Sequence, residues 1–373
     1  MTSICALAPS TAVRDQLGRK GGGTAARCYQ CATCSSVCAL SLDDSPFPRR
    51  QMLWAQWGLA ERLAVDPAVW LCYQCNDCTV RCPRDARPGD VLQAVRALLI
   101  ESLAFPRALG KLVANARVTW PILIGGPILF WVALLAATGL LSVPKEPLAF
   151  GDFVPHWLIY AVFFPISGWV TCVGWVSGRR FWNLLGQGSP RSGSFLANLV
   201  PVLVEIAIHK RFTSCDVARP RRLGHLFLLW GFVGAAVTSG LLILALYGFH
   251  AKLPLPQPHP FKLLGNISGV LLVVGGVILV MNRLNDKDSA GASTAFDIFF
   301  LGTVVAVIAT GVLAEVARLA ALAGFACAIY AVHLGMVMTL FLTFPYSKFA
   351  HMLYRTLALV HVRMVAAPPA TGA

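Results

Sequence analysis

Hydrophobic and polar residues follow two different patterns along the chain. Within residues 51–65 and 91–99, apolar positions recur at mostly helical spacing, and no strand-like alternation is present. After Thr119 the sequence consists almost entirely of long uncharged apolar runs. The pattern predicts an all-α protein in which a small helical domain precedes a polytopic bundle of membrane helices.

The apolar runs are long enough to span a bilayer, which takes about 20 consecutive apolar residues in a helix. They cover residues 119–143, 157–177, 223–249, 263–281, 296–317 and 319–344. The last boundary is the least marked, because only Glu315 and Arg318 interrupt residues 296–344. Five spans are the alternative, but one helix over that whole stretch would be far too long for a bilayer. We therefore expect about six spans with a turn near Arg318.

Composition indicates a membrane protein, and the distribution of charge predicts which side of the membrane is cytoplasmic. The chain is 57% hydrophobic and 13% charged, with a formal net charge of +14. The basic residues flank apolar runs on one side, which argues against nucleic-acid binding and predicts a cytoplasmic location for that side. They are Arg107, Lys111, Arg117, Arg179, Arg180, Arg191, Lys210, Arg211, Arg219, Arg221 and Arg222. The opposite connections carry only Lys145, Lys252 and Lys262.

Residues 1–25 contain no apolar segment of signal-peptide length. We therefore expect a multi-pass protein of the cytoplasmic (inner) membrane, with its N-terminal domain and both termini in the cytoplasm.

Eight of the 12 cysteines form two groups with identical spacing, C-x2-C-x2-C-x3-C, and both groups begin Cys-Tyr-Gln-Cys. This is a duplicated bacterial ferredoxin motif, in which three close thiolates bind one cluster and the fourth binds the other. The pattern predicts two [4Fe-4S] clusters. One would be held by Cys28, Cys31, Cys34 and Cys82, and the other by Cys72, Cys75, Cys78 and Cys38.

The two cysteine motifs differ in the residue that follows the last cysteine, and zinc is the alternative metal. Pro83 after Cys82 fits the ferredoxin motif, whereas Ala39 after Cys38 departs from it. Two zinc sites are the alternative, but zinc sites normally use cysteine pairs. The four remaining cysteines are scattered singly: Cys5, Cys172, Cys215 and Cys327.

Histidines near the membrane runs are candidate ligands of b-type haem, and the missing C-x-x-C-H motif excludes covalent c-type haem. His333 lies inside the last span, where an ionisable group is a functional candidate. His351 follows about five helical turns later. His225 begins the third span, and Gly231 and Gly234 beyond it could make room for a macrocycle or let helices pack closely.

The other histidines are more ambiguous. His209 ends an amphipathic segment, residues 195–209, and could be an interfacial cation or a fourth imidazole ligand. His259 and His361 lie in polar or terminal surroundings and are expected at the surface. Glu315 and Arg318 could take part in proton transfer or form a plain interfacial ion pair.

The stretch from His333 to His351, HLGMVMTLFLTFPYSKFAH, resembles the last haem helix of the respiratory nitrate reductase gamma family. The resemblance implies that both histidines are axial ligands of bis-histidine haems, with two haems in the domain. That family places its other two ligands ten residues apart on an earlier helix. Counting from His225 leads to Ala235, so the replacement ligand is open.

The order of the two domains resembles a fusion of the C and E subunits of heterodisulfide reductase, as in the C subunit of the quinone-interacting membrane-bound oxidoreductase complex. This implies a protein that passes electrons between quinone and flavin-containing iron–sulfur partner subunits, linked to adenylylsulfate reductase in sulfur metabolism. Alternatives are a heterodisulfide-reductase-like or sulfite-reductase-linked complex, or a haem-free membrane anchor for a ferredoxin. The expected domains are residues 1–106 (ferredoxin), 107–118 (linker), 119–355 (cytochrome) and 356–373 (cytoplasmic tail).

Overall fold

The computed structural model describes residues 8–144, 148–210, 219–285 and 291–366. All regular secondary structure in these ranges is helical, which confirms the all-α prediction. Some residues singled out above lie outside the described ranges: Cys5, Lys145, Arg211 and Cys215.

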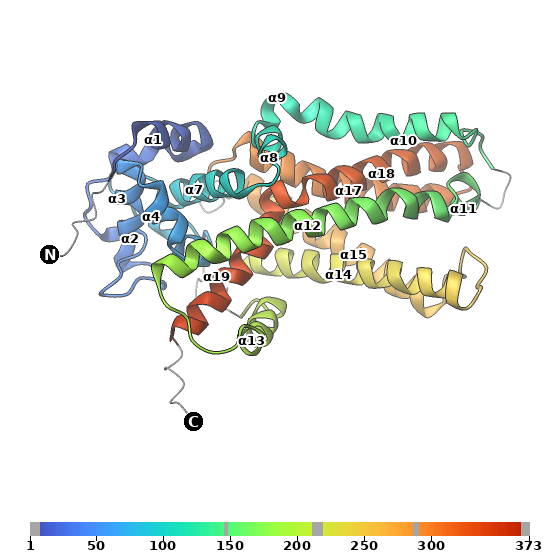
Figure 1. The fold of residues 1–373 in the computed structure, drawn as a ribbon. Helices are drawn as coiled ribbons and strands as arrows, with labels where there is room; N and C mark the ends of the chain where they lie inside the picture. Colours follow the sequence, from blue (N-terminus) through green and yellow to red (C-terminus); the bar gives the residue numbers. More distant parts are fainter. Residues whose placement is uncertain (1–7, 145–147, 211–218, 286–290, 367–373) are drawn as a thin grey trace.

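The N-terminal domain consists of short helices that lie at one end of the molecule (Figure 1). α1 begins where the Ser10 hydroxyl accepts a hydrogen bond from the backbone N–H of Val13, and α7 begins with Pro88 in its first turn. The helices are α1 (Thr11–Leu17), α2 (Thr33–Ser36), α3 (Arg49–Trp57), α4 (Ala60–Val65), α5 (Ala68–Leu71), α6 (Asp77–Val80), α7 (Pro88–Leu103) and α8 (Arg107–Ala114).

Six helical segments in the described residues are long and apolar enough to cross a membrane, as predicted. The first combines α9 (Ala116–Trp120), a π-helical turn (Pro121–Gly125) and α10 (Gly126–Ala137). The others are α12 (His156–Gly188), α14 (Arg219–Gly248), α15 (Pro260–Asn285), α17 (Ala295–Leu319) and α18 (Ala323–Thr343). The short helix α11 (Phe150–Phe153) precedes α12. These helices run side by side in Figure 1.

The predicted turn near Arg318 separates α17 from α18. Ala321 adopts a left-handed backbone with φ of 56°, and α18 starts two residues later. At the other end of α17, the side chains of Thr294 and Asp297 each bond the other's backbone N–H in a capping box. The apolar stretch therefore forms two spans.

Glycines in α14 serve the packing of α14 against α15. A Cβ atom on Gly231 would lie 2.7 Å from the Leu272 side chain, and one on Gly234 would lie 2.2 Å from the Ser268 hydroxyl. Both glycines thus allow close helix approach, which is the packing role expected for small residues in membrane helices.

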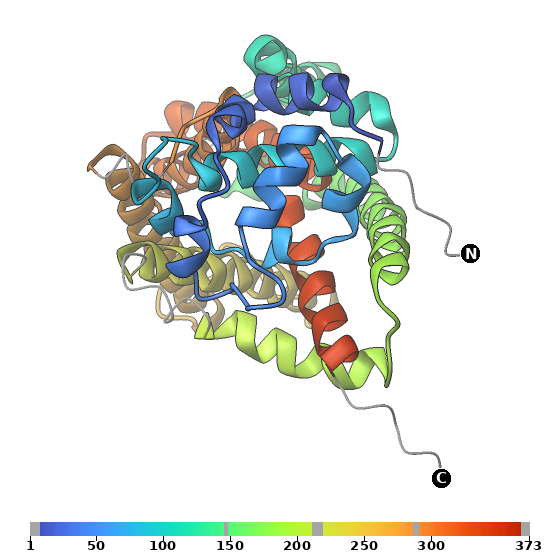
Figure 2. The same cartoon turned by 90° about the vertical axis from the view of Figure 1, so that its left-hand side faces the viewer.

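Two helices connect the bundle with the N-terminal domain. α12 is 33 residues long, about 50 Å, so it exceeds the hydrocarbon core of a bilayer and continues alongside the N-terminal helices. α19 (His351–Ala366) crosses the same end of the bundle, and α13 (Phe195–Ala207) lies across it (Figure 2).

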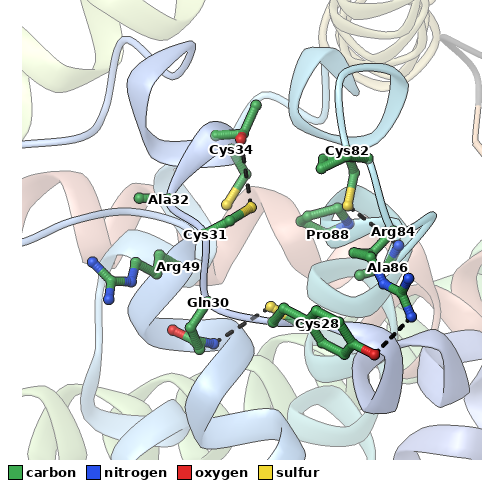
Figure 3. A pocket seen from close by; sticks show the side chains of 13 residues that line it. Cys28, Gln30, Cys31, Ala32, Cys34, Arg49, Cys82, Arg84, Ala86 and Pro88 are labelled. Carbon is green, nitrogen blue, oxygen red and sulfur yellow. Dashed lines mark hydrogen bonds between the residues drawn. The ribbon is translucent and has the colours of Figure 1, made fainter.

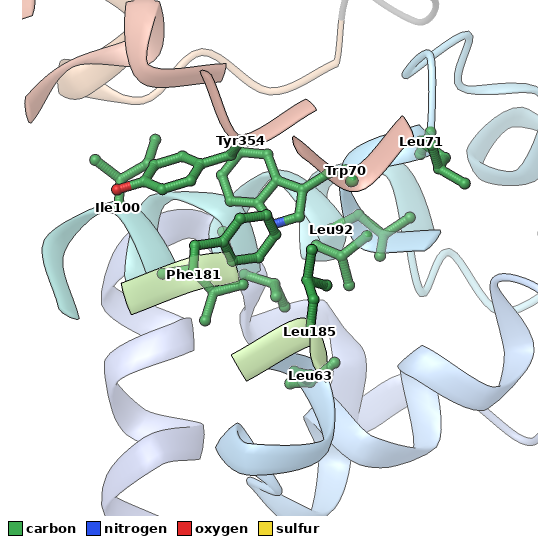
Figure 4. Close-up of a cluster of buried hydrophobic side chains, with 14 of the residues drawn as sticks. Leu63, Trp70, Leu71, Leu92, Ile100, Phe181, Leu185 and Tyr354 are labelled. Carbon is green, nitrogen blue, oxygen red and sulfur yellow. The ribbon is translucent and has the colours of Figure 1, made fainter. Parts of the chain in front are cut away.

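The largest hydrophobic core joins α5, α7, α12 and α19 (Figure 4). At its centre the rings of Trp70, Phe181 and Tyr354 contact one another, with centroids 4.8–5.8 Å apart. All three side chains are buried. The N-terminal domain and the bundle are therefore fixed to each other by a shared core.

The C-terminal segment differs from the expected tail. Residues 356–366 continue α19, and Leu359 and Val360 are buried in the shared core. His361, expected at the surface, is 2% exposed and stacks edge-on against Trp182 of α12. Burial lowers the pKa of His361 to about 4. The burial of His361 could not be predicted from its position near the end of the chain, because the residues that pack against α19 come from distant parts of the sequence.

Candidate functional site

Cys28, Cys31, Cys34 and Cys82 line one pocket at the end of the N-terminal domain. Their sulfur atoms turn toward a common space (Figure 3). Three of these cysteines come from the loop before α2 and from α2 itself, and the fourth follows α6. The structure thus brings together one of the two predicted sets of four.

Cys38, Cys72, Cys75 and Cys78 line a second pocket together with Phe47 and other residues. Here the three closely spaced cysteines precede or lie on α6, and Cys38 follows α2. The fourth cysteine of each motif therefore lies in the pocket of the other motif, as the ferredoxin pattern predicts for its ligands.

The two cysteine loops share an unusual backbone conformation. Gln30 and Ala32 have φ values of 60° and 70°, and the equivalent Gln74 and Asn76 have φ values of 54° and 67°. Residues other than glycine rarely adopt this left-handed backbone conformation, which costs about 1–3 kcal/mol per residue. The duplication thus extends to strained geometry, a feature typical of functional sites.

Hydrogen bonds and burial set the chemistry of the thiols. Backbone N–H groups of Gln74 and Ala86 donate to the sulfur atoms of Cys72 and Cys82 at 3.3 Å. Burial raises the pKa of Cys38 to about 11. Cluster binding must therefore displace protons from this site, because only thiolates ligate iron.

The cysteine geometry also bears on the zinc alternative. Within the described ranges, no three His, Cys, Asp or Glu side chains converge closely enough to hold a single metal ion. A zinc site needs all its sulfur ligands about 2.3 Å from one ion. Each pocket is instead lined by three closely spaced cysteines and one distant cysteine rather than by cysteine pairs, which favours an iron–sulfur cluster.

Three of the four candidate haem histidines lie together at the end of the bundle next to the N-terminal domain. His209 follows α13, His225 lies on α14, and His351 begins α19. The Nε2 atom of His209 is 2.8 Å from Nδ1 of His225, and the ring centroids of His225 and His351 are 6.0 Å apart.

The hydrogen bonds assign the proton positions of these three rings. The Nδ1 atom of His209 lies 2.7 Å from the carbonyl oxygen of Ile206, and Nδ1 of His351 lies 2.5 Å from that of Lys348. A carbonyl only accepts, so both Nδ1 atoms carry hydrogen. Nε2 of His209 then accepts from Nδ1 of His225. Burial lowers the pKa of His209, and that of His351 to about 4, which keeps both rings neutral near pH 7.

His333 lies apart from this group, inside α18. Its Nδ1 is 3.0 Å from the hydroxyl of Thr310, which donates its own hydrogen to the carbonyl of Ala306 at 2.6 Å. A Cβ atom on Gly311 would lie 2.9 Å from the His333 ring, so glycine is needed for this close contact. Because the Thr310 hydroxyl already donates to Ala306, it accepts a hydrogen bond from His333, so Nδ1 of His333 carries the hydrogen, as it does in His225 and His351.

Three arginines hold the loop that enters the second cysteine pocket. Arg96 donates to the carbonyls of Val69 and Cys72, each at 2.7 Å. Arg221 donates to the carbonyls of Gln74 and Tyr73 at 2.6 and 2.9 Å. Arg355 donates to the Cys72 carbonyl at 3.3 Å, and its guanidinium lies 4.4 Å from the Tyr73 ring centroid.

The sequence patterns predict no role for these arginines at the cysteine site. Arg221 is expected only as part of the positive side of the membrane. The one signal in the sequence is spacing: Arg221 precedes His225 by four residues, and Arg355 follows His351 by four. Arginine and histidine therefore share a helix face in both cases.

The fold and these sites define a multi-pass membrane protein with an iron–sulfur domain for electron transfer. Residues 24–86 match the family model of the 4Fe-4S dicluster domain, and residues 92–372 match that of citrate utilization protein B. The chain belongs to the citrate utilization protein B family. Its dicluster domain supports two [4Fe-4S] clusters.

Individual relatives agree with this assignment. Citrate utilization protein B of Escherichia coli is 28% identical over 369 residues, covering 89% of this chain and 88% of that protein. A protein of Archaeoglobus profundus, named as similar to the C subunit of heterodisulfide reductase, is 37% identical over 78 residues, covering 21% of this chain and 42% of that protein. The chain thus spans less than half of the latter relative. No solved structure matches the chain.

The similarity to the C subunit of heterodisulfide reductase extends to Methanothermobacter thermautotrophicus. The C subunit of its H(2):CoB-CoM heterodisulfide,ferredoxin reductase is 35% identical over 83 residues, which is 22% of this chain and 44% of that protein. The chain therefore combines an iron–sulfur domain similar to this subunit with a set of apolar, membrane-length helices.

Proposed function

We propose that this protein passes electrons between membrane quinone and flavin-containing iron–sulfur partner subunits, by way of haem b and two [4Fe-4S] clusters. The observation that supports this most is the short segment 69–74. It enters the second cysteine pocket, and its carbonyls are bound by arginines one helical turn from His225 and His351. When bound, the clusters and the haem supply one-electron transfer.

The cluster ligands in this proposal are the two sets of cysteines gathered in the pockets. Cys28, Cys31, Cys34 and Cys82 hold the first cluster, and Cys38, Cys72, Cys75 and Cys78 hold the second. The domain division remains residues 1–106 for the ferredoxin and 119–355 for the cytochrome, with α19 as part of the shared core.

In this proposal, His225 and His351 would hold the iron of one haem. Each ring has Nδ1 engaged in a hydrogen bond, so Nε2 is the nitrogen that would bind iron, an arrangement typical of metal-bound histidine. The ring centroids of His225 and His351 lie 6.0 Å apart, so the two imidazoles are close enough that they would hold one iron together.

His209 has a different proposed role from the fourth axial ligand expected from the sequence. Both of its ring nitrogens already make hydrogen bonds, to Ile206 and to His225. It would orient His225 and increase the basicity of that ligand. His333 remains the proposed ligand of a second haem, since its Nδ1 is fixed by Thr310 in the same manner.

The proposed location is the inner membrane with the N-terminal domain in the cytoplasm. The support is the positive-inside rule, because Arg179, Arg180 and Arg191 lie at the end of α12 that contacts this domain, or just after it. At the far end of the bundle, Glu315 pairs with Lys262 at 2.8 Å and with Arg318 at 2.8 Å. This geometry favours an ion pair over a proton path.

Two metabolic roles are candidates for this electron transfer, and both are taken from similar proteins. The full-length relative is named for citrate utilization, so an electron-transfer step in the use of citrate is the first candidate. A link to adenylylsulfate reductase, or to a heterodisulfide- or sulfite-reductase-linked complex, is the second. Identification of the subunits that purify with the chain separates these candidates.

A pyridine haemochrome spectrum of the purified protein tests the cytochrome function. We expect b-type haem in the wild type and a loss of at least one haem in His351→Ala, with cluster iron retained. His259→Ala, at the far end of the bundle, serves as the control and should keep the full haem content. A wild type without haem would refute the proposal and support the haem-free anchor.

A further inference from the structure

The two cysteine loops have the same backbone but differ in what holds them. In the first loop, the carbonyl of Cys28 accepts a hydrogen bond from the neutral amide of Gln56 at 2.8 Å. In the second loop, the equivalent carbonyl of Cys72 accepts from two guanidinium groups, those of Arg96 and Arg355. A neutral donor in one half of the duplication thus corresponds to cationic donors in the other.

All three cations at the second loop are partly buried, whereas the first pocket is lined by one partly buried arginine, Arg49, and one exposed arginine, Arg84. Arg96, Arg221 and Arg355 are all partly buried. Near the first pocket, Arg84 stacks on Tyr29 at 4.0 Å, and both side chains are exposed, with Tyr29 69% exposed. Solvent screens an exposed charge strongly and a partly buried one much less.

We propose that Arg96, Arg221 and Arg355 are positioning residues that fix the second cluster beside the histidine group and raise its reduction potential above that of the first cluster. Reduction adds one negative charge to a cluster. Three nearby cations in a region of low dielectric constant stabilise that charge, which is one way proteins tune cluster potentials. The first loop, held by a neutral amide at the equivalent carbonyl, gains less of this stabilisation.

The position of the arginines couples the two kinds of site mechanically. Arg221 and His225 lie on one face of α14, and Arg355 and His351 lie on one face of α19. The two helices that carry these histidines therefore also carry the arginines that donate hydrogen bonds to the carbonyls of Cys72, Tyr73 and Gln74. Movement of the loop away from the histidines would break these bonds.

A redox titration followed by electron paramagnetic resonance tests this inference on the full-length protein in detergent. The signals are first assigned with Cys31→Ser, which alters the first cluster, and Cys75→Ser, which alters the second. The wild type should show a higher potential for the second cluster. Arg355→Gln should lower that potential by at least a tenfold change in the reduction equilibrium, or about 59 mV for one electron, and leave the first cluster unchanged.

Two further variants separate charge from structure. Arg355→Lys keeps the charge and should retain most of the wild-type potential, whereas the matched Arg84→Gln at the exposed position should change neither cluster by that amount. If Arg355→Gln loses the cluster, Arg96→Gln takes its place in the comparison. Equal shifts of both clusters, no shift in any arginine variant, or a lower potential of the second cluster in the wild type would overturn the inference.

This inference builds on the electron-transfer function proposed above, but the titration needs only the clusters. Absence of haem or of reaction with quinone would refute the proposed function and leave the potentials measurable.

Discussion

Ala32 offers a direct test of the strained cysteine loops. Its φ of 70° places alanine in the left-handed region, at the position where the second loop has Asn76. Alanine in this region costs about 1–2 kcal/mol relative to its preferred conformation. Glycine avoids that cost, but its greater freedom in the unfolded chain offsets about 0.4–1 kcal/mol. Ala32→Gly should therefore stabilise the folded loop by about 1 kcal/mol, or roughly fivefold in an equilibrium.

The assay is the rate at which an iron chelator removes the first cluster under anaerobic conditions. Cys31 is exposed in this pocket, so chelation begins there once the loop opens. Ala32→Gly should slow the release of first-cluster iron about fivefold, because opening becomes less favourable. Ala32→Val should lose the first cluster, since a β-branched residue is a genuine outlier at positive φ.

Ala39 supplies the matched control, because it is an exposed alanine near the same cluster motifs without a positive φ. Ala39→Gly should leave the rate unchanged or increase it, since glycine only adds freedom to the unfolded chain there. Unchanged or faster release in Ala32→Gly would refute the claim that the loop stores strain.

Three further predictions concern the buried polar groups and the shared core. Lys348→Met removes the cation 2.5 Å from Asp297, a carboxylate that is 3% exposed. Leaving this buried carboxylate without its ion-pair partner should lower the free energy of unfolding by about 3–5 kcal/mol, measured as a lower Tm in detergent. The double variant Lys348→Met with Asp297→Asn should recover most of this loss. His209→Ala should keep the haem held by His225 and His351 but shift the reduction potential and the spectrum of that haem, whereas loss of that haem would make His209 a ligand. Trp70→Ala should cost about 3–5 kcal/mol and increase proteolysis between the two domains, and an unchanged Tm would contradict the shared core.

The fold and the cysteine groups could be predicted from local patterns. Apolar run length determines the spans, and the break near Arg318 follows from the thickness of a bilayer. The grouping of Cys82 with the first motif and of Cys38 with the second agrees with the ferredoxin spacing. These features depend on residues that are close in sequence or on a known duplication.

The remaining features depend on contacts between distant parts of the chain. Nothing near Arg96 or Arg355 in the sequence reveals that both bind the Cys72 carbonyl. The burial of His361 requires α12 to extend beyond the bilayer, which hydropathy alone does not show. Similarly, His209 could be assigned an orienting role only once its distance to His225 was known.

In the electron path proposed above, the haem at His225 and His351 connects quinone with the clusters. The most direct test follows the reoxidation of the chemically reduced clusters by a quinone analogue, in protein reconstituted into vesicles, for the wild type and for His351→Ala with its cluster iron intact. If this path operates, the clusters are reoxidised rapidly in the wild type and stay reduced in His351→Ala. Equal rates in the two proteins would contradict it.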